Sequence, residues 1–247
     1  KNSTTPPAVD DLAAAKEALQ TLIEQTNSLL ETSATVTTSE KEQATKLALQ
    51  TTNDQADAHL YCNAPHSDKN STDYSPASEG YWLLDGDNTT FLHTNWDNNI
   101  NSADGLDHYI RVYSAEALDK FTFTYTTRWN KNGEPWVGNP TVIEVEGCNT
   151  PTGTYEPIAT LSDQGTNPLP TQYYKPYAQV YTSDLLTASS PYKYIRFRVT
   201  ATEQNKTAYG HKWFYISEFA FSKVEIVKVY EAVLHGSNGV TEAIAID

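Results

Sequence analysis

The feature of this sequence that most limits its fold is the alternation of apolar and polar residues in a series of short runs. In "KFTFTYTTRW" (120–129), Phe121, Phe123 and Tyr125 stand at every second position, with threonines between them. Successive side chains of a β-strand point to opposite faces of a sheet, so this pattern predicts a strand with one buried and one solvated face. "KYIRFRVTAT" (193–202) alternates in the same way, with arginines on its polar face. Both runs indicate half-buried antiparallel sheet.

Similar runs recur along the chain, and turn-rich segments rather than helical patterns separate them. They lie at 108–115, 141–148, 155–162, 178–184 and 213–229. Seven or more short strands without interleaved helices are typical of a β-sandwich. We therefore expect a mainly β fold, an antiparallel β-sandwich, over residues 58–230.

The stretch ahead of the expected sandwich has a different pattern. Its apolar residues form one stripe at helical spacing, at Leu12, Leu19, Leu22, Ile23, Leu29 and Leu30. Asp10 or Asp11 is placed to cap the start of such a helix. This stretch therefore predicts an amphipathic helix.

A weaker form of the same pattern follows the polar turn "ATVTTSE". Ser39 and Glu42 have the spacing of a capping box at the start of a second helix. The helical stripe that follows consists of Ala44, Leu47, Ala48, Thr51 and Ala56. Two helices joined by a short turn form an antiparallel pair, so we expect an α-helical hairpin over residues 10–57.

The two ends of the chain have the character of connections. Pro6 and Pro7 resist helix, which predicts a flexible linker over residues 1–9. The sequence contains no methionine, so we expect its numbering to begin after a leader such as a signal peptide. A spacer of this kind can follow a secretion signal or a lipid-anchored cysteine, which predicts an extracellular or cell-surface protein. Residues 231–247 either add a last strand or begin a further module.

The charge of the chain excludes several classes of partner. Its 17 basic and 31 acidic residues give a formal net charge of −14. Such an excess of acid repels phosphate, so we expect neither nucleic acid nor an anionic membrane surface as a partner. No apolar run approaches the roughly 18 residues of a membrane span, and we expect no transmembrane segment. Cys62 and Cys148 match no zinc pattern and form either one disulfide or two buried thiols.

Acids, hydroxyls and aromatic residues are concentrated in "LLDGDNTTFLHTNWD" (83–97). An EF-hand loop that starts at Asp85 requires glycine at its sixth position, which is Thr90, so that type of metal loop is excluded. Two interpretations remain. Asp85 and Asp87 either satisfy backbone N–H groups of a tight glycine turn, or they form an oxygen site for Ca²⁺ with the Thr90 hydroxyl and backbone carbonyls.

Four motifs, in this order, resemble one family. "LLDGDNTTFLHTNW" is similar to the "DG(D/N)xxTxWxS" stretch that opens coagulation factor V/VIII type C (discoidin) domains and family 32 carbohydrate-binding modules. "TVIEVEGCNTPTGTYEPIATL" resembles the strand, turn and strand of that family, "YKYIRFRVTAT" its "RYIRI" strand, and "WFYISEFAFSKVEI" its closing "AEIEVYG". The motifs cover residues 60–228. The resemblance implies a galactose-binding-like jelly roll, and the helical segment ahead of it is similar to exported multidomain proteins of gut Bacteroidetes.

The sequence departs from the family pattern in three places. Phe91 stands where the family usually has tryptophan, and Thr94 where it usually has serine. The usual "SxDGxxW" turn has become "GCNTPTGTY". These changes are compatible with the fold and leave the specificity for a ligand open.

The resemblance also implies a structural calcium ion. In the family this ion ties the acidic loop to the glutamate of the last strand, which is Glu218 here. We therefore expect Asp85, Asp87, Thr90 and Glu218 to bind Ca²⁺. The alternative, in which the two aspartates only form a turn, stays open.

The residues favour binding over catalysis. The sequence has no GxSxG elbow, HExxH helix, P-loop or dinucleotide-binding glycine pattern, so we expect no enzyme. A sugar presents apolar C–H faces beside hydroxyls, so its site needs an aromatic platform and planar hydrogen-bonding groups. Side chains of these types gather in the expected loops at His93, Trp96, Arg128, Trp129, Trp136 and His211, with Asn98, Asn99 and Asn130 nearby.

Each of these candidates also has a purely structural interpretation. The tryptophans can cover the ends of the sandwich, and Arg128 can bind a carboxylate or a backbone carbonyl. We expect a non-catalytic extracellular carbohydrate-binding module for glycan adhesion. The alternative is an adhesion or spacer module that binds protein, or no ligand, in a multidomain surface protein.

Overall fold

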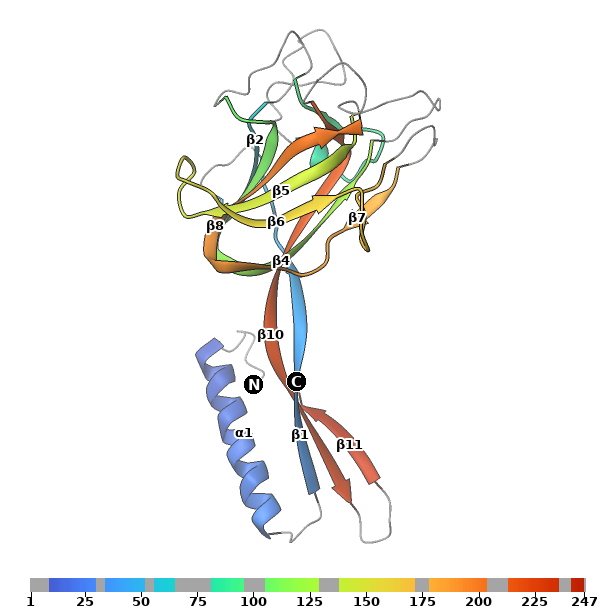
Figure 1. Ribbon diagram of the computed structural model, residues 1–247. Helices are drawn as coiled ribbons and strands as arrows, with labels where there is room; N and C mark the ends of the chain where they lie inside the picture. Colours follow the sequence, from blue (N-terminus) through green and yellow to red (C-terminus); the bar gives the residue numbers. More distant parts are fainter. Residues whose placement is uncertain are drawn as a thin grey trace. The chain divides into compact units, whose positions relative to one another are not determined.

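The computed structural model describes most of the chain, at residues 9–29, 34–51, 56–64, 81–95, 105–128, 138–171, 178–203, 213–235 and 241–246. The chain divides into two compact units (Figure 1). Unit 1 comprises Lys1–Gln43 and Ile226–Asp247, and unit 2 comprises Ala44–Glu225. The candidate site lies in unit 2.

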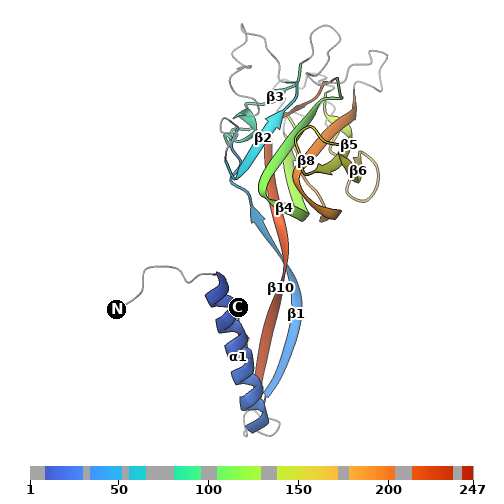
Figure 2. The same ribbon diagram turned by 90° about the vertical axis from the view of Figure 1, so that its left-hand side faces the viewer.

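Antiparallel strands make up most of unit 2, which confirms the predicted fold class. They are β2 (Ala58–Cys62), β3 (Leu92–His93), β4 (Tyr109–Thr126), β5 (Pro140–Cys148), β6 (Glu156–Ser162), β7 (Val180–Thr182), β8 (Leu186–Thr202) and β9 (Tyr215–Ile216), with a 3₁₀ turn η1 (Tyr81–Leu83). Two further strands, β1 (Ala34–Lys46) and β10 (Glu218–His235), pair with each other and belong in part to each unit (Figure 2). The runs predicted at 108–115 and 120–129 form one long strand, β4.

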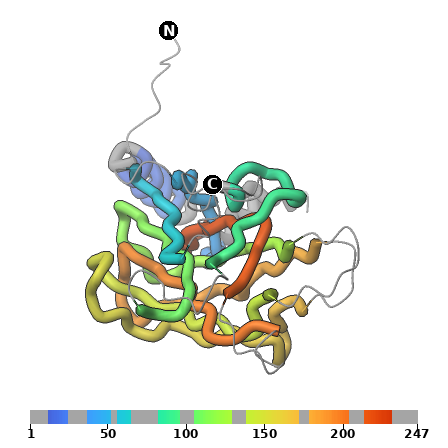
Figure 3. The backbone as a smooth tube through the Cα atoms, turned by 90° about the horizontal axis from the view of Figure 1, so that it is seen from above, coloured from blue at the N-terminus to red at the C-terminus, as the bar shows by residue number. Residues whose placement is uncertain are grey.

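Strand β4 organises the larger sheet. The strand order is β1-β10-β4-β8-β5-β6, and β2 and β7 also pair with β4. Strands β3 and β9 form a separate two-stranded sheet. Figure 3 looks down on the chain and shows the strands of unit 2 around a common centre. Buried apolar side chains of these strands form the core.

Alternating residues of these strands supply the core, as the sequence predicts. Phe121, Phe123 and Tyr125 of β4 are at most 2% exposed. The ring of Phe123 lies 4.6 Å from that of Phe197 on β8 and 5.9 Å from that of Phe219 on β10. Large buried rings of this kind dominate the energetics of a core. Thr122 and Thr124 stand between them in the strand and therefore point to the opposite face of the sheet.

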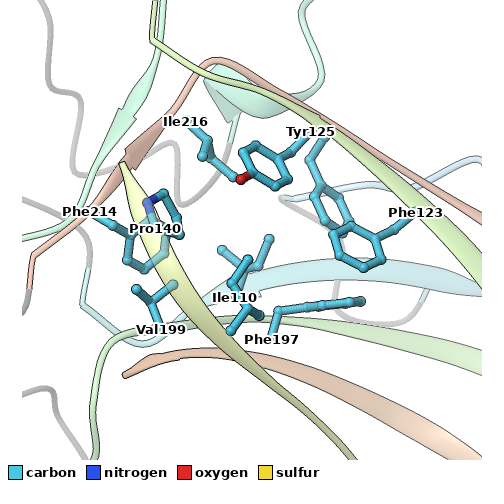
Figure 4. Close-up of a pocket in the computed structure, with 10 residues that line it drawn as sticks. Ile110, Phe123, Tyr125, Pro140, Phe197, Val199, Phe214 and Ile216 are labelled. Carbon is cyan, nitrogen blue, oxygen red and sulfur yellow. The ribbon is translucent and has the colours of Figure 1, made fainter. Parts of the chain in front are cut away.

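The two sheets face each other across a cavity of about 20 Å³, drawn in Figure 4. The cavity is lined by Ile110, Phe123, Tyr125, Pro140, Ile143, Phe197, Val199, Phe214, Ile216 and Phe219. Tyr125 alone among these has a polar side-chain atom, and its hydroxyl oxygen is directed toward Ile216. That hydroxyl is buried and has no hydrogen-bond partner.

The first predicted helix is present as α1 (Val9–Leu29). Three leucines of its apolar stripe, Leu12, Leu19 and Leu22, are 47%, 38% and 58% exposed. No helix in the described part of the chain has the length and apolar character needed to cross a bilayer.

The second predicted helix is wrong, and with it the hairpin over residues 10–57. Residues 34–46 form strand β1. The residues that follow make sheet contacts instead of a helix: Leu47 donates its backbone N–H to the Phe221 carbonyl at 2.9 Å, and Gln50 bridges to His59. The β-branched "TVTT" favours a strand, and pairing with the distant β10 outweighs a weak helical spacing.

The C-terminal segment adds a last strand, β11 (Thr241–Ile246). It pairs antiparallel with β10, with Tyr230 opposite Ile246. Of the two possibilities for residues 231–247, the additional strand is therefore present.

Both cysteines are buried and free. Cys62 belongs to β2 and Cys148 to β5, and β4 and β8 lie between these two strands in the sheet. The structure therefore has two buried thiols rather than one disulfide.

Candidate functional site

The acidic stretch at residues 85–90 folds into a tight turn. Gly86 has a φ of +77°, a left-handed conformation that glycine adopts without steric cost. Both carboxylate oxygens of Asp85 accept hydrogen bonds across the turn, from the backbone N–H of Asp87 at 2.9 Å and from the Thr90 hydroxyl at 2.7 Å. The backbone N–H of Thr90 donates to the Asp87 carbonyl at 3.1 Å and closes the turn.

The carboxylate of Asp87 stabilises the same turn from its exposed side. Its Oδ1 accepts the backbone N–H of Thr89 at 2.9 Å and the Thr89 hydroxyl at 2.7 Å. These hydrogen bonds lower the pKa of Asp87 below its usual value, the side-chain bond more than the backbone bond. Asp87 thus serves as a turn former.

Glu218, the first residue of β10, lies against this turn. Its carboxyl group lies near the carboxyl group of Asp85 and near the backbone N–H groups of Gly86 and Asp87. Burial raises the pKa of Glu218 to about 7; the bond to Asp85 and its negative charge add to the rise, and the two N–H groups oppose it. The Oε1 atom of Glu218 is buried without a hydrogen-bond partner.

The structure therefore brings Glu218 to the acidic turn, and it divides the four predicted metal ligands into two kinds. Asp85, Asp87 and Thr90 hydrogen-bond within the turn, whereas Glu218 approaches it from β10 and lies near Asp85. Within the described ranges, no group of three or more His, Cys, Asp or Glu side chains is placed to hold a metal ion. Carboxylate oxygens are the type of ligand that a hard cation such as Ca²⁺ prefers, and Glu218 has one buried oxygen without a hydrogen-bond partner.

Next to the turn, side chains from three parts of the sequence form what we call the aromatic cluster: Phe91, His93, Arg128, Trp213 and Tyr215. The ring of His93 lies 4.8 Å from that of Trp213 and 5.7 Å from that of Tyr215. The guanidinium of Arg128 lies 3.8 Å from the centre of the Phe91 ring and 5.4 Å from that of Tyr215. These cation–π contacts hold the guanidinium in one orientation.

Members of the aromatic cluster differ in their exposure. Phe91, His93 and Tyr215 are buried, whereas Arg128 and Trp213 are half-buried. The Nδ1 of His93 donates to the backbone carbonyl of Thr94 at 2.7 Å, because a carbonyl can only accept. Arg128 and Trp213 are therefore the members that a ligand can reach, and His93 supports the indole of Trp213.

Buried hydrogen bonds around Thr94 hold the two short strands together beside the cluster. The Thr94 hydroxyl donates to the Phe214 carbonyl at 3.1 Å and accepts the Phe214 N–H at 2.8 Å. It also accepts from Nδ1 of His108 at 2.9 Å, since its single proton is directed to Phe214. The hydroxyl that threonine shares with the serine usual in the resembled family is thus structural.

Gly138 lets the cluster close. A Cβ atom on Gly138 would lie 2.2 Å from the indole ring of Trp213, far inside contact distance. Its N–H donates to the Tyr215 hydroxyl at 3.0 Å, and its carbonyl accepts the Tyr215 N–H at 3.3 Å. Trp213 therefore packs directly on the backbone of Gly138, and a larger residue would displace it.

Of the six predicted binding residues, His93 and Arg128 lie in the aromatic cluster. The other four candidates lie within one or two positions of a described residue: Asn95, Arg128, Gly138 or Trp213. Arg128 and Trp213 belong to the cluster, and Gly138 packs against it. The candidates outside the described residues are Trp96, Trp129, Trp136 and His211, together with Asn98, Asn99 and Asn130.

Sequence reasoning missed Trp213 and Gly138. Trp213 begins the run "WFYISEF", where it has the appearance of a strand residue; its place two positions after His211 was the available signal. The role of Gly138 comes from the approach of a distant segment, for which a single glycine in a sequence gives no signal.

Comparisons with known proteins give structural matches alone. No family model matches the sequence, and no curated protein matches it. The family 32 carbohydrate-binding module of Clostridium perfringens NanJ, in complex with galactose, is similar at 14% identity and a TM-score of 0.42, over 74% of this chain and all of that one.

Two further solved structures are similar at this level. A family 32 module of a Clostridium perfringens protein, in complex with GalNAc-β-1,3-galactose, has 13% identity and a TM-score of 0.42, over 67% of this chain and 94% of that one. The C-terminal domain of a chitobiase from Bacteroides fragilis has 16% identity and a TM-score of 0.43, over 74% and 99%. We base the functional proposal on the residues of this chain.

Proposed function

We propose that unit 2 is a non-catalytic carbohydrate-binding module whose ligand site includes the aromatic cluster. The observation that supports this most is the placement of a reachable indole, Trp213, and a stacked guanidinium, Arg128, in one cluster. An indole face packs against the apolar C–H face of a sugar ring, and a fixed guanidinium donates to its hydroxyls. This combination suits a neutral glycan.

The segments that carry the other candidates adjoin the cluster in the sequence. Trp96 follows Asn95, Trp129 follows Arg128, and Trp136 and His211 each stand two positions before a cluster neighbour. We propose that these segments complete the site. The absence of enzyme motifs from the sequence supports a binding role, and so does the presence of aromatic rings and a guanidinium, rather than paired acids, in the cluster.

A glycan array tests this proposal. We expect the full chain to bind neutral glycans, and both Trp213→Ala and Trp129→Ala to lose most of the signal because the stacking surface is gone. Tyr230→Ala, on the part of β10 that belongs to unit 1, is the control and keeps the signal. A blank array for the folded wild type would refute carbohydrate binding and support the spacer or protein-adhesion module.

We further propose that Asp85 and Glu218 hold a calcium ion that stabilises the turn beside the cluster. The buried unsatisfied oxygen of Glu218 and its contact with a second acid support this. The ion would neutralise both acids and tie β10 to the segment that leads into Phe91. Few-ligand sites of extracellular modules bind Ca²⁺ at about 10⁻⁴–10⁻³ M, which suits the extracellular or cell-surface location that we propose.

The calcium proposal is tested by melting the protein in CaCl₂ and in chelator. At 10 mM Ca²⁺ and a Kd of about 1 mM, binding adds about 1.4 kcal/mol, or about 3–6 °C in Tm. Glu218→Gln should show no response to Ca²⁺, and in chelator it should melt no lower than wild type because the two acids no longer repel. Glu156→Gln, at an exposed acid of β6, is the control. An undiminished Ca²⁺ response in Glu218→Gln would refute the site.

A further inference from the structure

The outer face of the sheet in unit 2 carries a group of arginines and tyrosines that the proposed site does not use. Residues directly opposite one another on neighbouring strands point to the same face. One row across β2, β4, β8 and β5 consists of Tyr61, Arg111, Arg196 and Glu146. The next row contains Tyr113 on β4 and Tyr194 on β8. Three of the four arginines of the sequence lie on this face.

Two of these arginines, Arg196 and Arg198, form ion pairs with nearby carboxylates. Glu146 pairs with Arg196 at 2.7 Å and with Arg198 at 2.9 Å, and Asp107 pairs with Arg198 at 3.0 Å. Arg111 stands directly opposite Arg196 in the sheet. Like charges in such a position repel, and the carboxylate of Glu146 neutralises the Arg196 side of the pair.

Arg111 has no carboxylate partner among the described residues. Its Nη1 donates to the carbonyl of Pro151 at 2.9 Å, and the guanidinium also bonds to the hydroxyl of Tyr155. The rings of Tyr61 and Tyr194 lie 4.6 Å and 5.4 Å from it. In a chain of net charge −14, this is a positively charged point held rigidly between aromatic rings.

Beside Arg111, two tyrosines form a small platform. The rings of Tyr113 and Tyr194 are 5.0 Å apart, and both side chains are half-buried. A guanidinium presents five N–H donors in a planar fork that matches the oxygens of a carboxylate or a sulfate. A tyrosine ring packs against the C–H face of a sugar.

We propose that this outer face is a second carbohydrate site, in which Arg111 binds the carboxylate or sulfate of an acidic sugar and Tyr113 and Tyr194 pack against the sugar ring. The inference depends on the proposed function for the class of ligand alone, because the aromatic cluster contributes no residue to it. An anion at Arg111 gives this guanidinium the acidic partner that Arg196 and Arg198 already have, so charge favours an acidic sugar over a neutral one.

The test is a titration of the full chain, followed by NMR or calorimetry, at 50 mM NaCl. The probes are trigalacturonic acid, a sulfated galactose trisaccharide, uncharged galactotriose and hexaglutamate. We expect at least one acidic sugar to bind at least fivefold more tightly than galactotriose on this face, and 500 mM NaCl to weaken it. Arg111→Gln should weaken that binding at least fivefold, and Arg111→Lys, which keeps the charge, less.

Matched variants separate this site from the aromatic cluster. Lys223→Gln, which removes a cation paired with Glu116 and Glu225, should leave acidic-sugar binding unchanged. Trp213→Ala should keep acidic-sugar binding, and Arg111→Gln should keep neutral-glycan binding. If the wild type binds an acidic sugar but no neutral glycan, the function proposed for the aromatic cluster is overturned and the separate site at Arg111 is supported.

Three results would overturn the inference. They are no binding of either acidic sugar by wild type, undiminished binding by Arg111→Gln, and hexaglutamate binding as tight as that of the sugars, which indicates a protein partner. If Arg111→Gln unfolds, Tyr113→Ala replaces it, and acidic-sugar affinity that is unchanged in Tyr113→Ala then overturns the platform.

Discussion

Replacing Tyr125 by phenylalanine is expected to stabilise the protein. The Tyr125 hydroxyl is buried without a hydrogen-bond partner, and the cavity beside it is otherwise lined by apolar residues. A water molecule there would find one polar partner, whereas buried water usually has two to four. Burial raises the pKa of Tyr125 well above its usual value, and the charges of Tyr181 and Glu203 add to this. The hydroxyl is thus an uncompensated polar group in the core.

The size of the gain follows from the cost of that group. A buried donor or acceptor left unsatisfied costs about 1–3 kcal/mol, while the ring and its contacts are unchanged by the substitution. We expect Tyr125→Phe to gain about 1–2 kcal/mol in free energy of unfolding. For a unit of this size that is about 2–8 °C in Tm.

The matched substitution Tyr215→Phe is expected to change the free energy of unfolding in the opposite direction. The hydroxyl of Tyr215 is also buried, and it accepts the N–H of Gly138 at 3.0 Å. Tyr215→Phe leaves that N–H unsatisfied and should lose about 1–3 kcal/mol. Urea denaturation of both variants at constant m-value measures the difference. If Tyr125→Phe is as destabilised as Tyr215→Phe, the hydroxyl has a partner and the reasoning fails.

Two further substitutions test the packing of the candidate site. Thr94→Val removes the hydroxyl that bonds to Phe214 and His108 and should lower the free energy of unfolding, measured by urea denaturation, by about 2–4 kcal/mol. Thr94→Ser keeps the hydroxyl and should stay within about 1 kcal/mol of wild type. Equal losses in the two variants would contradict a structural role for the hydroxyl. Gly138→Ala should displace the indole of Trp213, lose about 1–3 kcal/mol and weaken neutral-glycan binding, and an unchanged tryptophan emission spectrum together with wild-type binding would count against the close packing.

Much of the β fold could be predicted from local alternation, because a half-buried strand shows its two faces in its own sequence. The run at 193–202 lies within β8, and its alternate residues Ile195, Phe197 and Val199 are buried. The failure at residues 39–57 has the converse cause. Strand β1 is polar and its residues 37–46 are exposed, so no alternation of buried and exposed side chains marks them, and the strand exists through pairing with β10. Local spacing carries no information about such a distant partner.

The candidate site was predictable in composition and less so in geometry. The resemblance placed Glu218 at the acidic turn, and the structure has that contact with Asp85. Which acids would touch was not predictable, because Asp87 bonds to Thr89 instead. His93 was predicted as a ligand contact and is buried behind Trp213, since strand pairing decides which side chain of a short strand faces inward.

The two buried thiols allow partial unfolding of the sheet to be followed by the rate at which each cysteine is alkylated. Cys62 is 1% exposed on β2 and Cys148 is 8% exposed on β5, so an alkylating reagent reaches each one when its own strand separates from the sheet. Mass spectrometry of the two labelled peptides at low denaturant would then time the departure of each strand separately. The order in which the two strands leave the sheet can therefore be measured with the native cysteines alone, without a substitution that adds a labelling site.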